Sequence, residues 1–462
     1  MAIVIVGLGP GDPKYLTQEA WRILNEAPRI YVRTREHPTV AALPPDKVFS
    51  FDDVYAREIE FVAVYEEIAR RVIELGAQPG GVVYAVPGHP YVGERTTQRI
   101  RELAQERGLE VRVVNGVSFL EPIFAALNLD PLEQTGLQIA DAMVIAQRHY
   151  PPLEPTRPAL IAQCDSRTLA SDVKLTLLNA YPEDHPVVVL SGAGTDTATI
   201  RQVPLGELDH SSQFDCLTTL YLPPVAPGGA VTDLLEVMAR LRAPDGCPWD
   251  RQQTHESLRA YLLEETYEVL AALDRGDMEA LCEELGDLLL QIVFHIQIAS
   301  EGSLFRMADV TRGIVTKLWR RHPHVFGDVL VSGVGEVLHN WEAIKADERI
   351  HKSGHSSPLS GIPQRLPALA QAQAYLARAE RLGLNQPADL STVATLLSEL
   401  EHAPDAEEHL GQVLLILVNW ARQHDLDAES ALRVANTRLA TQVDQLYERV
   451  RTGNPMASSE QS

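Results

Sequence analysis

The sequence has few cysteines and no long run of apolar residues. Four cysteines are scattered among its 462 residues, and no two of them form a CxxC pair: Cys164, Cys216, Cys247 and Cys282. This pattern argues against a disulfide framework or a zinc site and fits a reducing compartment. Because no run of about 18 apolar residues exists, we expect no membrane span. The short apolar start lacks a basic flank and is typical of a first β-strand, not of a signal peptide, so we expect a cytoplasmic protein.

Positive charge is also scarce. The chain carries 40 Lys and Arg against 63 Asp and Glu, a formal net charge of −23. Proteins bind nucleic-acid backbones through clustered Lys and Arg, so we expect no nucleic-acid partner. Divalent cations, and nucleotides that carry them, suit such an acidic chain. Hydrophobic residues make up 45% of the sequence, which is enough for cores, and the length predicts roughly three domains.

The first half of the chain alternates short β-rich runs with helical patterns. β-rich runs occur at residues 81–86, 111–114, 159–162 and 187–190, and helical patterns at 16–25, 56–75 and 95–107. This alternation predicts an α/β domain with a largely parallel sheet. A proline-rich break at residues 150–158 is expected to separate two lobes. The domain is predicted to span residues 1–221, and a Pro- and Gly-rich linker residues 222–230.

The second half is predicted to be helical. Long helical patterns, among them residues 254–274, 277–301 and 307–321, follow the linker. A second linker at residues 351–363 would divide this half into all-α domains at 231–350 and 364–452, and the polar residues 453–462 are expected to form a disordered tail. The two helical domains look like a diverged repeat, because the segment 282–294 is similar to the segment 408–418.

The clearest chemistry lies in two acidic pairs on neighbouring predicted helices. Glu265 and Glu268 are three residues apart, as are Glu284 and Asp287, so each pair lies on one helix face. The connection at residues 274–277 is short, which makes the helices antiparallel neighbours. Four carboxylates can then converge between them, where they repel one another unless protonated or bound to a cation.

A solvated acidic face is the plain alternative for these residues. Both pairs sit in strongly apolar helices, beside residues such as Leu262, Leu270 and Leu288, and this favours a metal site. Oxygen ligands without a His or Cys partner are those that Mg²⁺ or Mn²⁺ prefers.

This pattern of EExxE followed by ExxD resembles the MazG family of all-α nucleoside triphosphate pyrophosphohydrolases. Three further segments resemble family motifs in the same order: 238–251, 317–327 and 340–345. The resemblance implies Mg²⁺-dependent cleavage of nucleoside triphosphates to monophosphate and pyrophosphate. By the same resemblance the metal ligands are Glu265, Glu268, Glu284 and Asp287, and Glu264 is a candidate to orient the attacking water.

The resemblance also implies a substrate-binding set. Lys317, Arg320 and Arg321 would bind the triphosphate, although cations at a helix C-terminus are the structural alternative. Trp249 and Trp341 are candidates to stack on the base, with core or lid packing as the alternative, and Lys345 lies in the third family segment.

The second helical repeat departs from this pattern. His409 and Gln412 stand where the first repeat has Glu284 and Asp287, and the EExxE counterpart near residues 397–401 is incomplete. Because Gln supplies no negative charge, we expect this copy to bind metal poorly and to act as a scaffold or dimerisation element. A regulatory nucleotide site is the other interpretation.

Three glycine-containing turns follow strands in the first half. Residues 6–12, 86–90 and 114–118 each end a predicted strand, and three loops at strand carboxyl ends can build one crevice. Together they resemble the tetrapyrrole methylase family, which binds S-adenosylmethionine (SAM) between two α/β lobes. The implied cofactor-binding residues are Gly7, Gly9, Gly11, Asp12, Gly88 and Gly116. Asp12 and His89 are the candidates for a general base, and each also has an ordinary turn role.

The leading hypothesis is therefore a nucleoside triphosphate pyrophosphohydrolase joined to a SAM-dependent methyltransferase-like domain. One alternative makes methyl transfer the main activity and the helical part a scaffold. Another makes the protein a non-catalytic nucleotide sensor. By resemblance to both families we expect a homodimer.

Overall fold

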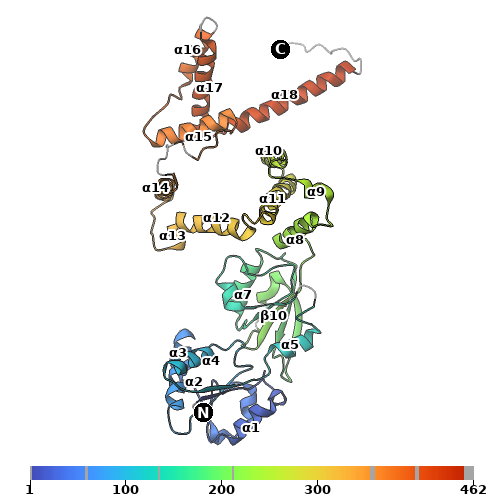
Figure 1. Cartoon of the computed structure of the whole chain (residues 1–462), viewed down its shortest axis with the longest axis vertical. Helices are drawn as coiled ribbons and strands as arrows, with labels where there is room; N and C mark the ends of the chain where they lie inside the picture. Colours follow the sequence, from blue (N-terminus) through green and yellow to red (C-terminus); the bar gives the residue numbers. More distant parts are fainter. Residues whose placement is uncertain are drawn as a thin grey trace. The chain divides into compact units, whose positions relative to one another are not determined.

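The computed structural model describes residues 3–57, 61–133, 136–210, 213–353, 359, 361–400 and 405–451. The chain divides into two compact units, Met1–Leu234 and Leu235–Ser462, whose elements are labelled in Figure 1. The predicted tail at 453–462, and residues 354–358 and 360 of the predicted linker, lie outside the described residues.

The first unit begins with a five-stranded parallel sheet. Its strands are β1 (Ile3–Gly7), β2 (Ile30–Val32), β3 (Val48–Ser50), β4 (Val82–Val86) and β5 (Val111–Val114), in the order β3-β2-β4-β1-β5. Alternate residues of β1 face opposite sides, as expected for a strand. Ile3 and Ile5 pack with α3 (Phe61–Gly76) and α4 (Arg95–Glu106), whereas Val6 packs with α1 (Gln18–Glu26). Helices therefore cover both faces, which explains the nearly continuous apolar runs.

The strand order places a switch point between β1 and β4. From β1 the chain crosses β4 to reach β2, whereas from β4 it crosses β1 to reach β5. The two crossovers run in opposite directions, so the loops at the carboxyl ends of β1 and β4 leave on opposite faces. A crevice at such a point is where doubly wound sheets bind ligands.

The second sheet corrects the prediction of a largely parallel domain. Its strands are β6 (Gln138–Asp141), β7 (Ala159–Ala162), β8 (Pro186–Ser191), β9 (Thr199–Pro204) and β10 (Thr218–Leu222), in the order β6-β7-β10-β8-β9. Among the described residues of this second sheet, β6 and β7 pair in parallel, and the other neighbouring strands are antiparallel. The short connection between β8 and β9 permits an antiparallel pair, while a parallel pair needs a long crossover.

The lobes also divide earlier than predicted. Strand β6 and helix α6 (Ala142–Ala146) precede the proline-rich break at residues 150–158, yet both belong to the second lobe. Ile123 of α5 (Leu120–Leu127) already packs against Leu160 and Leu190 of the second sheet. The proline-rich segment is therefore a loop inside the second lobe.

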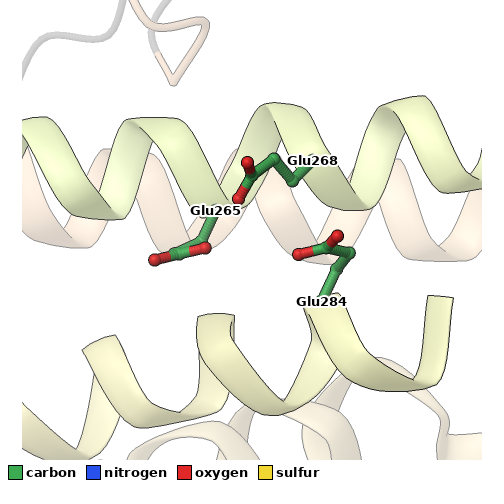
Figure 2. A group of neighbouring side chains, drawn as sticks. All are labelled: Glu265, Glu268 and Glu284. Atoms are coloured by element: carbon green, nitrogen blue, oxygen red, sulfur yellow. The ribbon is translucent and has the colours of Figure 1, made fainter. Parts of the chain in front are cut away.

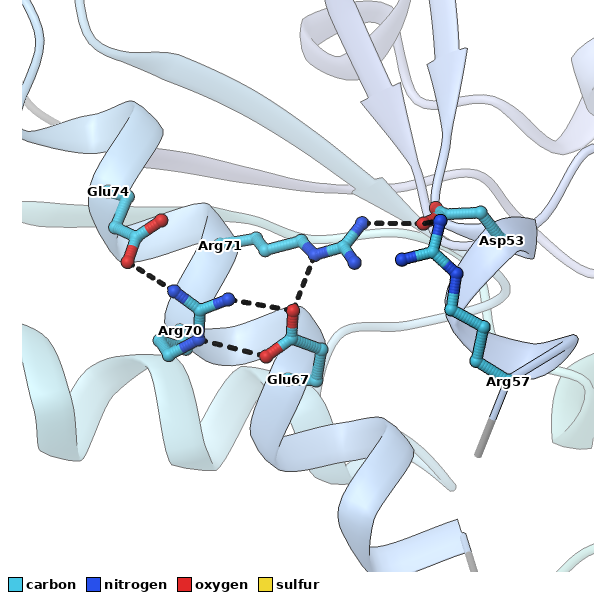
Figure 3. A network of polar contacts seen from close by, with 6 residues as sticks. All are labelled: Asp53, Arg57, Glu67, Arg70, Arg71 and Glu74. Carbon is cyan, nitrogen blue, oxygen red and sulfur yellow. Dashed lines mark hydrogen bonds and ion pairs between the residues drawn. The ribbon is translucent and has the colours of Figure 1, made fainter. Parts of the chain in front are cut away.

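A polar network joins two short stretches of the first lobe (Figure 3). Arg71 of α3 contacts Asp53 of α2 (Asp52–Tyr55) at 2.8 Å and Glu67 of its own helix at 2.7 Å. Glu67 also accepts a hydrogen bond from Arg70. The hydrogen bonds from Arg70 and Arg71 lower the pKa of Glu67 to about 2. Exposed ion pairs are individually weak, so the network fixes the position of α2 more than it stabilises the fold. The helix predicted at 56–75 is thus α3 from Phe61, with residues 58–60 outside the described part.

Helices make up the second half of the chain. They are α8 (Val231–Arg242), α9 (Pro248–Gln252), α10 (Arg259–Arg275), α11 (Met278–Glu301), α12 (Met307–Arg321), α13 (Pro323–Phe326), α14 (Val334–Ser353), α15 (Ala368–Arg381), α16 (Leu390–Leu400), α17 (Ala406–Gln423) and α18 (Ala428–Arg451). Among the described residues, no helix has the length and apolar character needed to cross a membrane.

A tight turn joins α10 to α11 and makes them neighbours. Gly276 ends α10 in the left-handed conformation, with φ of 67°, where glycine carries no side-chain penalty. The next residue, Asp277, caps α11 by accepting a hydrogen bond from the Ala280 amide at 3.1 Å. Helix α10 starts five residues later than predicted, because Thr254 and Ser257 exchange side-chain bonds that form a turn instead.

Candidate functional sites

Three carboxylates meet between α10 and α11. Glu265 and Glu268 extend from α10 towards Glu284 of α11 (Figure 2), and one oxygen of each lies within 4.8 Å of the others. Glu265 and Glu284 are half-buried, whereas Glu268 is exposed. A single cation can contact all three at such separations, and these oxygens are the donors that Mg²⁺ takes.

Crowding of negative charge shifts the titration of this cluster. Burial, a hydrogen bond that protonated Glu265 donates to Glu268, and the charge of Asp287 raise the pKa of Glu265 to about 7. Burial and the charge of Glu268 also raise the pKa of Glu284. Glu265 therefore keeps its proton to a higher pH than an ordinary carboxyl group, at a position where a cation can take the place of the proton.

The other two predicted acids sit at the margin of the cluster. Asp287 is exposed and is not part of the three-residue group, but its charge acts on both Glu265 and Glu284. Glu264 is exposed on α10, and its charge also contributes to the raised pKa of Glu265. The structure thus brings together three of the four predicted ligands and leaves Asp287 within electrostatic reach.

Three of the predicted basic residues, Arg320, Arg321 and Lys345, form a separate cluster between α12 and α14. Arg320 Nε donates to Glu348 Oε1 at 2.8 Å, and Arg321 Nη2 donates to Glu348 Oε2 at 2.5 Å. These bonds hold the pKa of Glu348 near 2. The ammonium of Lys345 lies 3.7 Å from the centre of the Trp341 ring, and the Arg321 guanidinium 5.8 Å from it. Trp341 is therefore engaged by the chain's own cations.

Sequence reasoning missed Glu348, although a signal was present. Trp341, Lys345 and Glu348 are spaced by four and three residues, which puts them on one face of α14. In the described part of the chain, no hydrogen bond or ion pair joins Lys317, Arg320 or Arg321 to the carboxylate cluster.

Two aromatic or histidine positions differ from their simplest interpretation. Trp249 is 52% exposed and meets Tyr261 edge-on with ring centres 6.1 Å apart, so its face remains accessible. His295 lies on α11, and only one of its two ring nitrogens has a hydrogen-bond partner among the described residues. Its Nδ1 lies 2.8 Å from Nδ1 of His255, while its buried Nε2 has no hydrogen-bond partner among the described residues.

The three glycine turns of the first unit touch at the switch point. A Cβ atom on Gly7 would lie 2.6 Å from the Gly88 oxygen and 2.7 Å from the Gly116 nitrogen, closer than side chains allow. Gly9 and Gly88 exchange backbone hydrogen bonds of 3.3 and 2.8 Å. Beside Gly88, with φ of +65°, the space for a Cβ is open. The turns thus form one backbone-lined corner that is open beside Gly88.

Asp12 and His89 have turn roles in this corner. Asp12 accepts a hydrogen bond from the Lys14 amide at 2.9 Å and pairs with the Lys14 ammonium at 2.7 Å, which lowers the pKa of Asp12. Nδ1 of His89 accepts a hydrogen bond from the Tyr91 amide at 3.1 Å.

These features define an α/β domain of methylase type followed by a helical domain of pyrophosphohydrolase type. The family "Tetrapyrrole (Corrin/Porphyrin) Methylases" matches residues 2–209, and the family "MazG nucleotide pyrophosphohydrolase domain" matches residues 253–326. The chain therefore belongs to the MazG family and carries a tetrapyrrole-methylase domain in front of it. Both resemblances seen in the sequence, and the predicted fold class, are confirmed.

Three sequence relatives agree with this assignment. The uncharacterized protein YabN of Bacillus subtilis (strain 168) is 38% identical over 463 residues, which cover 96% of this chain and 93% of YabN, and has the same two-domain architecture. The nucleoside triphosphate pyrophosphohydrolase/pyrophosphatase MazG of Thermotoga maritima is 41% identical, covering 47% of this chain and 85% of that protein. The nucleoside triphosphate pyrophosphohydrolase of Escherichia coli (strain K12) is 42% identical, covering 44% and 82%. The crystal structure of uroporphyrin-III-C-methyltransferase from Thermus thermophilus is 20% identical, covers 48% of this chain and 94% of that chain, and has a TM-score of 0.40.

Proposed function

We propose that the helical half of the chain hydrolyses nucleoside triphosphates to nucleoside monophosphate and pyrophosphate with Mg²⁺ or Mn²⁺. The observation that carries this proposal is the convergence of Glu265, Glu268 and Glu284 within 4.8 Å on facing helices. The names of the Thermotoga maritima and Escherichia coli relatives support the reaction.

The residues have distinct roles in this reaction. Glu265, Glu268 and Glu284 hold the metal, with Asp287 as the fourth acid, and Glu264 orients the attacking water. A bound Mg²⁺ supplies a positive charge for the phosphate oxygens and lowers the pKa of water. Water loses a proton and forms a bond to one phosphorus of the α–β linkage, the bond from that phosphorus to the bridging oxygen breaks, and pyrophosphate and monophosphate separate. Lys317, Arg320, Arg321 and Lys345 counter the charge of the triphosphate, and Trp249 offers its exposed face to the base.

Product analysis tests this proposal directly. With Mg²⁺ and a panel of common ribo- and deoxyribonucleoside triphosphates, monophosphate and pyrophosphate should appear in equal amounts, and EDTA should stop the reaction. Glu268→Gln should lower kcat by at least ~10³-fold, since a metal contributes several kcal/mol to such a transition state. The matched control is Glu279→Gln, an exposed acid on α11 outside the cluster. Stepwise release of orthophosphate, or full activity in Glu268→Gln, would contradict the proposal.

We further propose that the first unit binds SAM at the glycine corner, through Gly7, Gly9, Gly11, Asp12, Gly88 and Gly116. The family match and the open space beside Gly88 support this. Calorimetry with SAM should give a saturable signal, and no binding at millimolar ligand would reject the site.

We also propose a cytoplasmic homodimer that binds no nucleic acid. The free cysteines and the net charge of −23 support the location and the lack of a nucleic-acid partner. Large apolar side chains are exposed on α10, α11 and α12, which is typical of an interaction surface: Leu263, Leu285, Ile292, Ile314, Leu318 and Trp319. Analytical ultracentrifugation at micromolar concentration should show a dimer; a monomer there would reject this part.

A further inference from the structure

The glycine-rich loop after β1 is held from behind by two buried side chains that follow β2. Thr39, in the short helix η2 (Pro38–Ala42), is fully buried. Its Oγ1 lies 3.1 Å from the Leu8 carbonyl oxygen and 2.9 Å from the Gly11 carbonyl oxygen. One hydroxyl therefore connects both ends of the loop 8–11.

His37 holds the middle of the same loop. Its side chain is 6% exposed, and the ring makes a hydrogen bond to the backbone of Gly9. Burial lowers the pKa of His37 to about 4, so the ring is neutral near pH 7. A neutral ring does not repel the sulfonium cation of SAM. Its Nδ1 is buried and has no hydrogen-bond partner in the described ranges.

The other hydrogen bonds that this loop makes within the described residues join backbone atoms. The Gly88 amide donates to the Gly9 carbonyl at 2.8 Å, and the Asp12 amide donates to the Gly194 carbonyl of the second lobe at 3.2 Å. Gly9 and Gly11 adopt φ of 76° and 147°. Because glycine has no side chain, these two residues cannot fix the loop through side-chain contacts of their own. Hydrogen bonds from His37 and Thr39 thus complete a frame that sets the loop before a ligand arrives.

We propose that His37 and Thr39 are positioning residues that hold the loop 8–11 in the conformation that binds SAM. This inference rests on the proposed SAM site, and it adds two residues that touch the loop instead of the ligand. Pre-organisation of a binding loop raises affinity because less order is lost on binding.

Calorimetry with SAM on the full chain tests the role of Thr39. Thr39→Val keeps the shape and removes the hydroxyl, so Kd should rise at least about tenfold. Thr39→Ser restores the hydroxyl and should bind within about threefold of the wild type. Thr97→Val is the matched control, because Thr97 is also fully buried but its hydroxyl has no partner among the described residues. It should bind as the wild type does. His37→Phe keeps a ring but removes its nitrogen atoms, and it should weaken the binding of SAM as much as Thr39→Val does.

Hydrogen exchange in the ligand-free protein separates loop positioning from a general loss of stability. The amides of Gly9 and Asp12 should exchange faster in Thr39→Val than in Thr97→Val, at matched global stability by urea unfolding. Wild-type affinity in Thr39→Val, failure of Thr39→Ser to restore binding, or equal exchange in the two valine variants would overturn the inference. If the wild type itself binds no SAM, the cofactor proposal fails, and the exchange rates still decide whether Thr39 holds the loop.

Discussion

Two helix pairs in the second unit, α10–α11 and α16–α17, have similar sequences but different residues between their helices. In the pair α10–α11, the stripe Glu284, Asp287 and Gln291 follows one face of α11, and the buried Oε1 of Gln291 has no partner among the described residues. The corresponding stripe of α17 is His409, Gln412 and Ile416. There Ile416 and Val413 pack with Val393 and Leu396 of α16 in an apolar cluster.

The comparison shows that the acidic residues of the first pair lower its stability when no metal is bound. Carboxylates that raise one another's pKa and a buried amide without a partner both destabilise a metal-free helix pair. In the second pair an apolar cluster packs between the helices and favours their association, and no group of three metal-binding side chains is found there among the described residues. Local conflict with good packing is thus a signature of the functional copy.

Exchanging the residues between the pairs should have the largest effect. The double variant Glu284→His with Asp287→Gln gives the first pair the residues of the second. Its kcat/KM should fall by at least ~10³-fold, as the loss of about 4 kcal/mol of transition-state stabilisation does, while its metal-free Tm rises. The reverse exchange, His409→Glu with Gln412→Asp, should lower Tm and leave the rate of hydrolysis unchanged. Substantial activity in the first double variant would remove the distinction between the pairs.

The pH dependence of stability should reveal the raised pKa of Glu265. The pKa of Glu265 is about 7 in the folded protein against 4.5 for the free side chain. Between these values the folded state binds more protons, so stability falls as pH rises from 4.5 to 7, and the loss is complete above 7. Glu265→Gln removes this titration. In metal-free buffer its Tm should exceed that of the wild type by roughly 2–4 °C at pH 8, the shift that about 1 kcal/mol produces, and by little at pH 5.

Calorimetric scans across this pH range check the expectation, and Mg²⁺ supplies the control. Saturating Mg²⁺ should raise the wild-type Tm more at pH 8 than at pH 5 and should have a smaller effect on Glu265→Gln. A difference between the two proteins that does not vary with pH would show that Glu265 titrates normally.

The smallest effect is expected at Glu348, whose carboxylate accepts hydrogen bonds from Arg320 and Arg321 of α12. Because its carboxylate binds where a phosphate group can bind, Glu348→Gln should free Arg320 and Arg321 and lower KM for triphosphates by about threefold to tenfold, at nearly constant kcat. The exposed neighbour Asp347 provides the control variant Asp347→Asn. A higher KM in Glu348→Gln would instead show that the carboxylate orients the arginines for substrate.

Sequence patterns predicted the elements better than their partners. Helix α12 has the predicted bounds, 307–321, and the i, i+3 spacing placed Glu265 and Glu268 together. Direction in the second sheet was wrong because a β-rich run carries no sign of which neighbour it pairs with. Thr39 was missed because its role comes from contacts across 28 or more residues, which no local spacing encodes. For Glu348 the local spacing indicates the helix face, but its arginine partners lie 27 and 28 residues away in the sequence.

The touching backbones of Gly7, Gly88 and Gly116 limit how this protein can change. Neither Gly7 nor Gly116 can accept even a methyl group without pushing the neighbouring turns apart. Substitutions at these two positions should therefore not be tolerated. New ligand preferences in the first unit must arise from side chains farther out, such as those of the second lobe's loops, while the corner itself stays constant.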